Sequence, residues 1–347
     1  MRALRDLRPG RTLVAALGAL GLLVTGPGAA SAAGAPAVGN DPSLPTTVGT
    51  AHILWGSGHY AGNANQDNLI YHGGAVETTP AVYVVYWGTE WQKGFSVQAG
   101  GYTYTQQSAM NYVTTFFRNV GGTPWAGVQT QYCQGAAVGA FNCNGYLGAQ
   151  FVTNPRNQLK GVWIDPSPVP AEIVTTALAE NTTDDAVAVE AKNAAAHFGF
   201  NNNATYMIFT PPGHAATAYG SVYCAFHSET GHPYGARGIK YAFMPYTPEQ
   251  GAGCGGNSVN ATNDAFGHGY FDSYSLAGGH EYAEAVTDPD NFNGTQDGWN
   301  DAQTSENGDK CAYKFTKNVQ FGPQYFAVQP MWSNAYNNGA GGCAFSL

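Results

Sequence analysis

The sequence predicts an α/β fold, with a single domain whose mixed central sheet is flanked by helices and long disulfide-tied loops. Apolar runs typical of buried strands recur along the chain, and segments with helical spacing separate them. Six cysteines lie in the Gly-rich stretches between and after these segments. Strands that alternate with helices are typical of α/β proteins, in which helices cover the faces of a sheet.

The first predicted unit is a strand followed by a helix. Residues 81–87 (AVYVVYW) are β-branched and aromatic and stop at a glycine, as expected of a buried strand. Residues 106–120 place apolar side chains at helical spacing and are followed by two glycines, so we expect a helix that packs on this strand. The Gly-rich stretch 129–152 contains two cysteines and predicts an irregular or β-hairpin region.

The remaining elements continue the alternation. Short apolar runs predict further strands, and Ala-rich or periodic segments predict helices. The predicted strands cover residues 161–165, 204–209, 239–246 and 325–328, and the predicted helices cover residues 170–179, 184–197 and 274–287.

The N-terminal residues resemble an export signal. Four arginines precede an apolar run over residues 13–24, and an A-S-A cleavage site ends at Ala32. The apolar run is too short to span a bilayer comfortably, so no stable membrane anchor is expected. We therefore predict a signal peptide over residues 1–32, a flexible leader over 33–50 and a single secreted globular domain over 51–347.

Cysteine content and charge limit the class of protein. An even number of cysteines in an exported chain predicts disulfides. The simplest pairing joins sequence neighbours, namely Cys133–Cys143, Cys224–Cys254 and Cys311–Cys343. The formal net charge is −9 and the mature part has no basic run, so binding to nucleic acid is not expected.

The strongest chemical signal is the segment H-E-Y-A-E over residues 280–284. His280 and Glu284 are four apart and therefore share one helix face, with Glu281 beside them. Zinc hydrolases use this layout, with two helical ligands and an adjacent glutamate as general base. A carboxylate in the second ligand position makes the site harder and more anionic, so calcium and manganese become alternatives to zinc. The other interpretation is a solvated helix face.

Further ligands are expected downstream and upstream of this helix. Glu306 and Asp309 precede Cys311, whose disulfide would hold them in place, and either is a candidate third ligand or a residue that orients His280. His227 lies near Cys224 and is another candidate. Asp290, ten positions after the first histidine, is a fourth possibility.

These motifs resemble the EXORDIUM / phosphate-induced secreted protein family and its bacterial relatives. The resemblance is carried by H-E-x-A-E-x-x-T-D-P over residues 280–289 and E-x-G-D-x-C over residues 306–311. It covers roughly residue 80 to the end of the chain, with the segments 83–87 and 224–227 in matching order. It implies a secreted or cell-wall-associated protein with a shared site, while the activity of that family is unsettled.

Two functions remain open at this point. The first is a secreted metal-dependent hydrolase, more narrowly a peptidase, with Glu281 as general base and a divalent metal, zinc before calcium. Its partner would be an extracellular protein, peptide or cell-wall substrate. The second is a non-catalytic extracellular or cell-wall-associated binding protein, whose carboxylates hold a structural calcium and whose Tyr/Trp-rich surface binds glycan.

Overall fold

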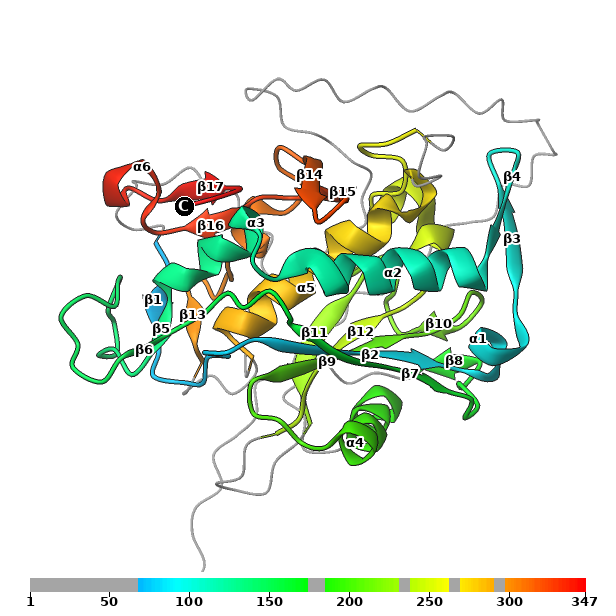
Figure 1. Cartoon of the computed structure of the whole chain (residues 1–347), viewed down its shortest axis with the longest axis horizontal. Coiled ribbons are helices and arrows are strands. Elements are labelled where there is room, and N and C mark those ends of the chain that lie inside the picture. The colour runs from blue at the N-terminus through cyan, green and yellow to red at the C-terminus, as the bar shows by residue number, and fades with distance from the viewer. Residues whose placement is uncertain (1–67, 174–184, 231–237, 262–268, 290–296) are drawn as a thin grey trace, which may run out of the picture. The chain divides into compact units, whose positions relative to one another are not determined.

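A five-stranded mixed sheet lies at the centre of the fold (Figure 1). The computed structural model describes residues 68–173, 185–230, 238–261, 269–289 and 297–347. The strand order is β11 (Phe226–Glu229), β12 (Lys240–Met244), β9 (Ala204–Phe209), β2 (Ala81–Trp87) and β7 (Leu159–Asp165). Neighbouring strands are parallel from β12 to β7, and β11 is antiparallel to β12. The predicted α/β class and mixed sheet are confirmed.

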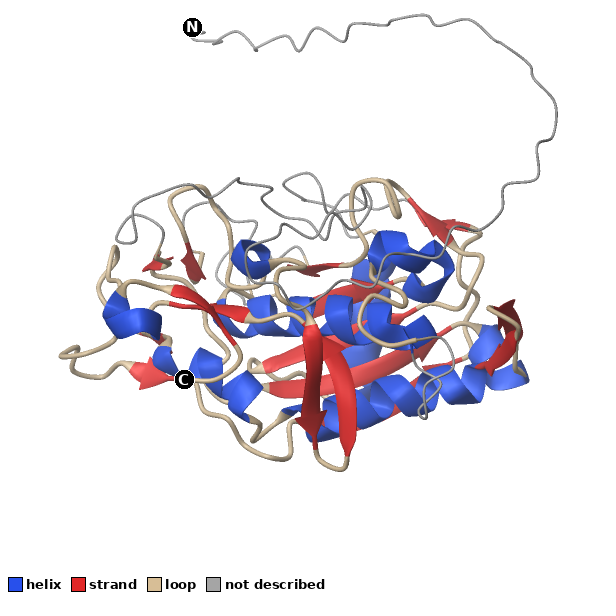
Figure 2. Cartoon of the chain, turned by 90° about the horizontal axis from the view of Figure 1, so that it is seen from above, coloured by secondary structure: helices blue, strands red, loops and turns tan. Residues whose placement is uncertain are grey.

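Helices cover both faces of this sheet (Figure 1), and Figure 2 shows the helices and strands from above. Successive side chains of a strand point to opposite faces, and β2 separates them between two cores. Val84 and Tyr86 join the core between the sheet and the helices α2 (Gln106–Val120) and α5 (Asp272–Thr287), whereas Val85 and Trp87 join the core between the sheet and α4 (Ala186–Phe198). Burial on both faces explains why the strand is a continuous apolar run instead of an alternating one.

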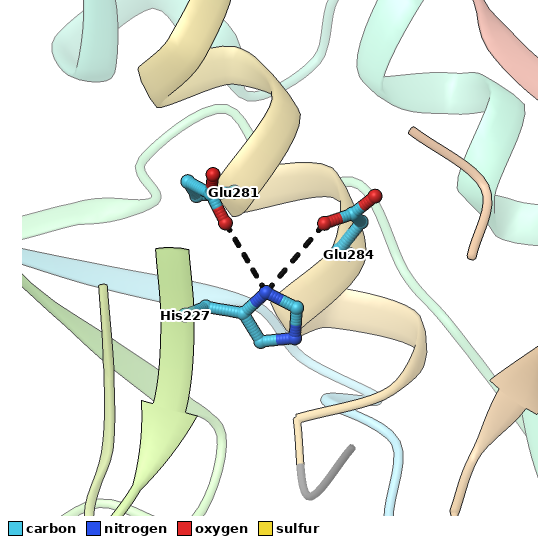
Figure 3. Close-up of side chains that lie close together, drawn as sticks. All are labelled: His227, Glu281 and Glu284. Atoms are coloured by element: carbon cyan, nitrogen blue, oxygen red, sulfur yellow. Dashed lines mark hydrogen bonds and ion pairs between the residues drawn. The ribbon is translucent and has the colours of Figure 1, made fainter. Parts of the chain in front are cut away.

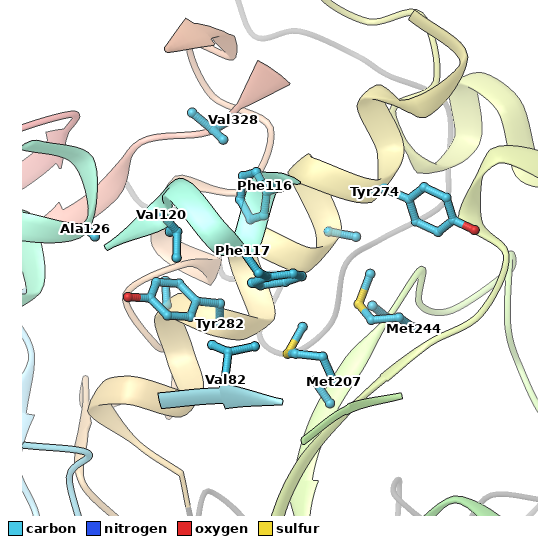
Figure 4. Packing of buried hydrophobic residues seen from close by; sticks show 14 of the residues in the cluster. Val82, Phe116, Phe117, Val120, Ala126, Met207, Met244, Tyr274, Tyr282 and Val328 are labelled. Carbon is cyan, nitrogen blue, oxygen red and sulfur yellow. The ribbon is translucent and has the colours of Figure 1, made fainter. Parts of the chain in front are cut away.

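Helix α2 (Gln106–Val120) forms where the sequence predicts it. Thr105 caps its first turn, because its side-chain oxygen accepts a hydrogen bond from the amide of Ser108. Phe117 is buried between the sheet and α5, where it contacts Phe209 and Tyr282, and Phe116 is buried beside Phe321 and Phe326 from the C-terminal part of the chain (Figure 4). Burial of one such side chain stabilises a fold by roughly 1.5–3 kcal/mol, so this face anchors the helix.

Helix α4 (Ala186–Phe198) packs on the opposite face of the sheet. Asp185 caps it by accepting hydrogen bonds from the amides of Val187 and Ala188. It buries mostly small side chains, which include Ala191 and Ala194, against β9 and β12. Small side chains allow a close approach of helix and sheet.

Helix α5 (Asp272–Thr287) is buried along its whole length, and every one of its residues is in the interior. Gly278 and Gly279 lie inside the helix, within the predicted range 274–287. A Cβ at Gly278 would meet the side chains of Phe117 and Met244 at ordinary distances of 3.4 and 3.5 Å, whereas a Cβ at Gly279 would meet Trp125 and Phe116 at 3.2 and 3.3 Å. Gly279 therefore lets these two aromatic side chains pack closely on the helix.

Short elements complete the fold. Two-stranded pairs are β1 (Ile70–Tyr71) with β13 (Trp299–Asn300), β3 (Ser96–Ala99) with β4 (Tyr102–Thr105), β5 (Cys133–Gln134) with β6 (Gln150–Phe151), β8 (Glu172–Ile173) with β10 (Ala215–Ala216), β14 (Lys317–Phe321) with β15 (Gln324–Val328), and β16 (Met331–Ser333) with β17 (Gly342–Ala344). Short helices are α1 (Thr89–Lys93), α3 (Pro124–Gly127), α6 (Tyr336–Gly339), and the 3₁₀ turns η1 (Val128–Gln131), η2 (Thr247–Cys254), η3 (Gly269–Phe271) and η4 (Asp309–Cys311).

The predicted disulfides are confirmed. Sequence neighbours pair, as Cys133–Cys143, Cys224–Cys254 and Cys311–Cys343. The first bridge lies at the predicted hairpin, where β5 pairs with β6. Disulfides persist in oxidising compartments, so these three bridges support an extracellular location.

One predicted helix, over residues 170–179, is wrong in the part that the structure describes. Residues 172–173 of the predicted helix 170–179 form strand β8, paired with β10, and residues 174–179 lie outside the described residues. Residues 172–173 instead pair with residues 215–216 in parallel register, and this long-range contact outweighs the local helix propensity of the segment.

The N-terminal predictions lie outside the described residues, because the signal peptide (1–32) and the leader (33–50) precede residue 68. All of the described residues belong to one compact unit. Among these described residues, no helix is long and apolar enough to cross a membrane.

Candidate metal centre

Helix α5 presents three chemically active side chains near its C-terminal end. His280 and Glu284 are one turn apart, and His280 Nε2 lies 3.0 Å from Glu284 Oε1. Glu281 is on the next position of the same turn. All three side chains are buried, with at most 1% of their surface exposed. The solvated helix face considered from the sequence is therefore wrong.

Strand β11 brings His227 to this helix. The neighbouring Phe226 points into the core beneath α4, so the alternation of the strand turns His227 to the face where α5 lies. Figure 3 shows the imidazole ring of His227 facing Glu281 and Glu284. The Cys224–Cys254 bridge lies three residues before His227 and ties down the start of this strand.

A loop from the C-terminal part of the chain packs over the same helix. Asn307 donates hydrogen bonds from Nδ2 to the carbonyl of Ala283 (3.1 Å) and to Thr287 Oγ1 (3.0 Å). Gly308 allows the close contact, because a Cβ there would lie 2.7 Å from Glu284 Oε1 and 2.9 Å from His280 Nδ1. The loop thereby places Glu306 and Asp309 beside α5.

The first group of possible ligands consists of His280, Glu284 and Asp309. One ligand atom from each lies within 4.8 Å of the other two, and all three residues are buried. Asp309 Oδ1 is 3.7 Å from His280 Nε2, and the Asp309 amide donates a 2.9 Å hydrogen bond to Glu284 Oε1. One nitrogen and several carboxylate oxygens suit zinc, manganese or calcium.

The second group consists of His227, Glu281 and Glu284, with ligand atoms equally close. His227 Nδ1 lies 3.2 Å from Glu281 Oε2 and 3.6 Å from Glu284 Oε2 (Figure 3). On the other side of the ring, Nε2 lies 3.2 Å from the carbonyl oxygen of Asp288 and 3.5 Å from Glu306 Oε1. Both ring nitrogens of His227 thus face oxygen acceptors.

Burial and crowding shift the protonation of these groups. Desolvation, together with the negative charges of Glu306 and Glu281, raises the pKa of Glu284 well above its usual value. Desolvation and the charge of Glu284 raise the pKa of Asp309 in the same way. Burial alone would lower the pKa of His227, but the neighbouring carboxylates, led by Glu306, raise it well above its ordinary value. Each shift opposes the accumulation of negative charge, which a bound cation would also relieve.

Several polar atoms of the site lack hydrogen bonds. Both ring nitrogens of His280, Glu281 Oε1 and Glu284 Oε2 are buried without a hydrogen-bond partner among the described residues. An unsatisfied buried polar group costs roughly 1–3 kcal/mol, so a cluster of such atoms needs an explanation. A cation coordinated by these atoms provides one.

The predicted site residues come together, although not all in one group. The structure places His280, Glu284 and Asp309 in the first group and His227 and Glu281 with Glu284 in the second. Glu306 belongs to neither group and approaches the far nitrogen of His227. Asp290 lies outside the described residues. Their roles as ligands or base stay predictions.

Two residues that shape the site were not predicted from the sequence. The backbone carbonyl of Asp288 faces His227, while its side chain accepts hydrogen bonds from Gly298 and Asn300. Asn307 fastens the loop to α5. Neither role could be deduced from residue type, although both residues lie within the two acidic motifs.

Comparisons with protein-family models, with curated proteins and with solved structures found no match to this chain. The resemblance to the EXORDIUM family therefore stays a prediction, and the geometry of the site is what bears on function.

Proposed function

We propose that the protein is a secreted metal-dependent hydrolase, with a divalent cation held by His280, Glu284 and Asp309. The observation that carries this proposal is the buried convergence of these three side chains around one point. Two come from one face of α5 and the third from a loop about 25 positions later, as the H-E-x-x-E segment and the downstream acidic motif predict. Zinc is the preferred ion, because a mixed nitrogen and carboxylate set suits it.

Glu281 would act as the general base. Its Oε2 is held by His227 Nδ1 at 3.2 Å, and its Oε1 is buried without a hydrogen-bond partner. A cation held by His280, Glu284 and Asp309 would polarise the substrate carbonyl and lower the pKa of a nearby water. Glu281 Oε1 would take the proton of that water as its oxygen attacks the carbonyl carbon. The same proton would then pass to the leaving nitrogen as the C–N bond breaks.

The substrate class follows from location and chemistry. Three disulfides support an extracellular site of action, and the N-terminal sequence resembles an export signal. We therefore propose an extracellular protein, peptide or cell-wall peptide as substrate.

The test compares Glu281→Gln with the matched variant Glu77→Gln. Glu77 is also buried, but it accepts a hydrogen bond from Thr205 and belongs to neither group of possible ligands. Each zinc-loaded protein is assayed against a library of internally quenched peptides, and its metal content is measured by mass spectrometry. We expect Glu281→Gln to keep the ion bound by His280, Glu284 and Asp309 and to lose activity by about 100-fold or more. Zinc-loaded wild type without activity, or Glu281→Gln with full activity, would overturn the assignment.

One observation favours a second function, a non-catalytic protein with a structural ion. His280, Glu281 and Glu284 each expose at most 1% of their surface, and structural metal sites are closed whereas catalytic ones keep an open position. Under this alternative the ion would be calcium, and its removal would lower the melting temperature while no peptide is hydrolysed.

A further inference from the structure

We propose that the site holds two divalent cations and that Glu284 bridges them. The first cation is the one assigned above to His280, Glu284 and Asp309, so this inference rests on the proposed function. The second would be bound by His227, Glu281 and Glu284. Nothing in the sequence motifs indicates a paired centre, because the H-E-x-x-E spacing by itself predicts a single ion.

The two oxygens of Glu284 face different partners. Oε1 lies 3.0 Å from His280 Nε2 and accepts the hydrogen bond from the Asp309 amide. Oε2 lies 3.6 Å from His227 Nδ1 and has no hydrogen-bond partner although it is buried. A carboxylate with one oxygen in each of two ligand groups has the arrangement of a bridging ligand.

The surroundings of His227 call for a positive charge at Nδ1. Nε2 faces the carbonyl oxygen of Asp288 at 3.2 Å, and a carbonyl can only accept, so Nε2 carries a hydrogen. In neutral imidazole the lone pair of Nδ1 then points at the carboxylates of Glu281 and Glu284. That contact is repulsive unless a proton or a metal ion lies between them. Metal-binding histidines commonly donate their other N–H to a backbone carbonyl, and His227 is arranged in this way.

The charge of the cluster also favours two cations. The carboxylates of Glu281, Glu284, Glu306 and Asp309 converge in a region where each is buried. Fully ionised they carry four negative charges, which two divalent ions would balance. One divalent ion together with protonated His227 would supply three positive charges, and this is the arrangement that the experiment must distinguish.

A paired centre would change how the water is held. Two ions about 3.5–4 Å apart can hold the attacking water between them and stabilise the charge on the substrate oxygen. Glu281 would bind the second ion through Oε2 and keep Oε1 as the proton acceptor. His227 would then be a metal ligand, whereas in a single-ion site it is a positively charged residue that positions Glu281.

The experiment counts zinc ions. Wild type, His227→Gln and Asp309→Asn are stripped with a chelator, titrated with Zn²⁺ in a calorimeter and analysed by mass spectrometry after gel filtration. His197→Gln is the matched control, because His197 stacks on Trp163 and α4 packs on the opposite face of the sheet. We expect two zinc ions per chain in wild type and in His197→Gln, and one in each of the other two variants.

Other outcomes separate the two proposals. In one outcome, wild type binds one ion that Asp309→Asn loses and His227→Gln keeps. That result overturns the proposal of a second ion and leaves the proposed function standing. One ion lost only in His227→Gln overturns both assignments, and so does a wild type that binds none. If His227→Gln does not fold, X-ray absorption of zinc-loaded wild type decides. Zinc–zinc scattering at about 3.5–4 Å supports the pair, and its absence overturns it.

Discussion

The backbone amide of Asp309 donates a 2.9 Å hydrogen bond to Glu284 Oε1 and so joins the C-terminal loop to helix α5. This bond fixes one oxygen of Glu284 and sets the Asp309 carboxylate beside the helix. The two residues are 25 positions apart, and no local rule of secondary structure brings them together. The geometry of the site therefore depends on how firmly the loop is held, and two of the predictions below test that dependence.

Gly308→Ala should weaken ion binding. The backbone of Gly308 has φ −75°, which any residue adopts, so the effect would come from crowding. Its Cβ would lie 2.7 Å from Glu284 Oε1 and 2.9 Å from His280 Nδ1, and such overpacking typically costs about 1–3 kcal/mol. Zinc affinity is measured by competition with a chromophoric chelator.

Gly278→Ala is the matched control for this change. It lies on α5, the helix that carries His280 and Glu284, and its Cβ would meet its nearest neighbours at 3.4 Å or more. Alanine is favoured over glycine inside a helix by about 1 kcal/mol, so this variant should bind zinc as wild type does. Unchanged affinity in Gly308→Ala would show that the loop does not constrain the ligands.

Removal of the Cys311–Cys343 bridge should lower both stability and ion affinity. Loss of one disulfide costs roughly 2–4 kcal/mol, and Cys311 follows Asp309 by two positions. The double variant Cys311→Ala/Cys343→Ala is compared with Cys133→Ala/Cys143→Ala, which removes the bridge at the β5–β6 pair. Both should lower the melting temperature, but only the first should weaken zinc binding. Equal affinities in the two variants would argue against a role of the bridge in the site.

The metal-free protein should become less stable as the pH rises through the raised pKa values of its buried carboxyl groups. The pKa values of Glu284 and Asp309 are raised above 4.5 and 3.8 by burial and mutual repulsion, so the folded state binds their protons more tightly than the unfolded state. This stabilisation is present at low pH and is lost as the pH rises through the raised values. The raised pKa of His227 acts in the same direction. Zinc should remove most of this pH dependence, and calorimetry with and without chelator measures the difference. Identical pH profiles in the two conditions would contradict the account.

A buried glutamate far from the site should give a separate pH effect. Burial, reinforced by Asp165, raises the pKa of Glu190 to about 8, while Asn193 donates a 3.0 Å hydrogen bond to Glu190 Oε2. Its contribution to stability is present below pH 4.5 and is lost as the pH rises through 8. Glu190→Gln should therefore lose less stability than wild type between pH 5 and 9, as measured by urea unfolding. The exposed Glu172→Gln serves as control, and a similar loss in all three proteins would refute the assignment.

The sequence predicted the sheet well, because its strands are strong local signals. The runs at residues 81–87 and 204–209 coincide with β2 and β9, and the periodic segment 106–120 coincides with α2. Helix α5 was found from its chemical motif and not from an apolar face, since it is buried on all sides. The described part of the segment 170–179 differs from the prediction because residues 172–173 pair with residues 215–216, a long-range contact that local helix propensity does not reveal.

The candidate site was predictable in composition but not in arrangement. The acidic motifs and the nearby histidine indicated which residues would converge. The division of Glu284 between two groups depends on the antiparallel register that pairs His227 with Ala242, and also on the loop contact at Gly308. Both features join residues that are far apart in the sequence. Local patterns of residues therefore do not predict them.

The most direct test of the central claim is the metal content of the mature protein, purified from the medium without added metal. Inductively coupled plasma mass spectrometry of wild type and Asp309→Asn gives the number of divalent ions per chain. The account predicts at least one ion in wild type, fewer in Asp309→Asn, and a lower melting temperature after treatment with a chelator. A metal-free wild type whose melting temperature does not respond to chelator or to added zinc would contradict it.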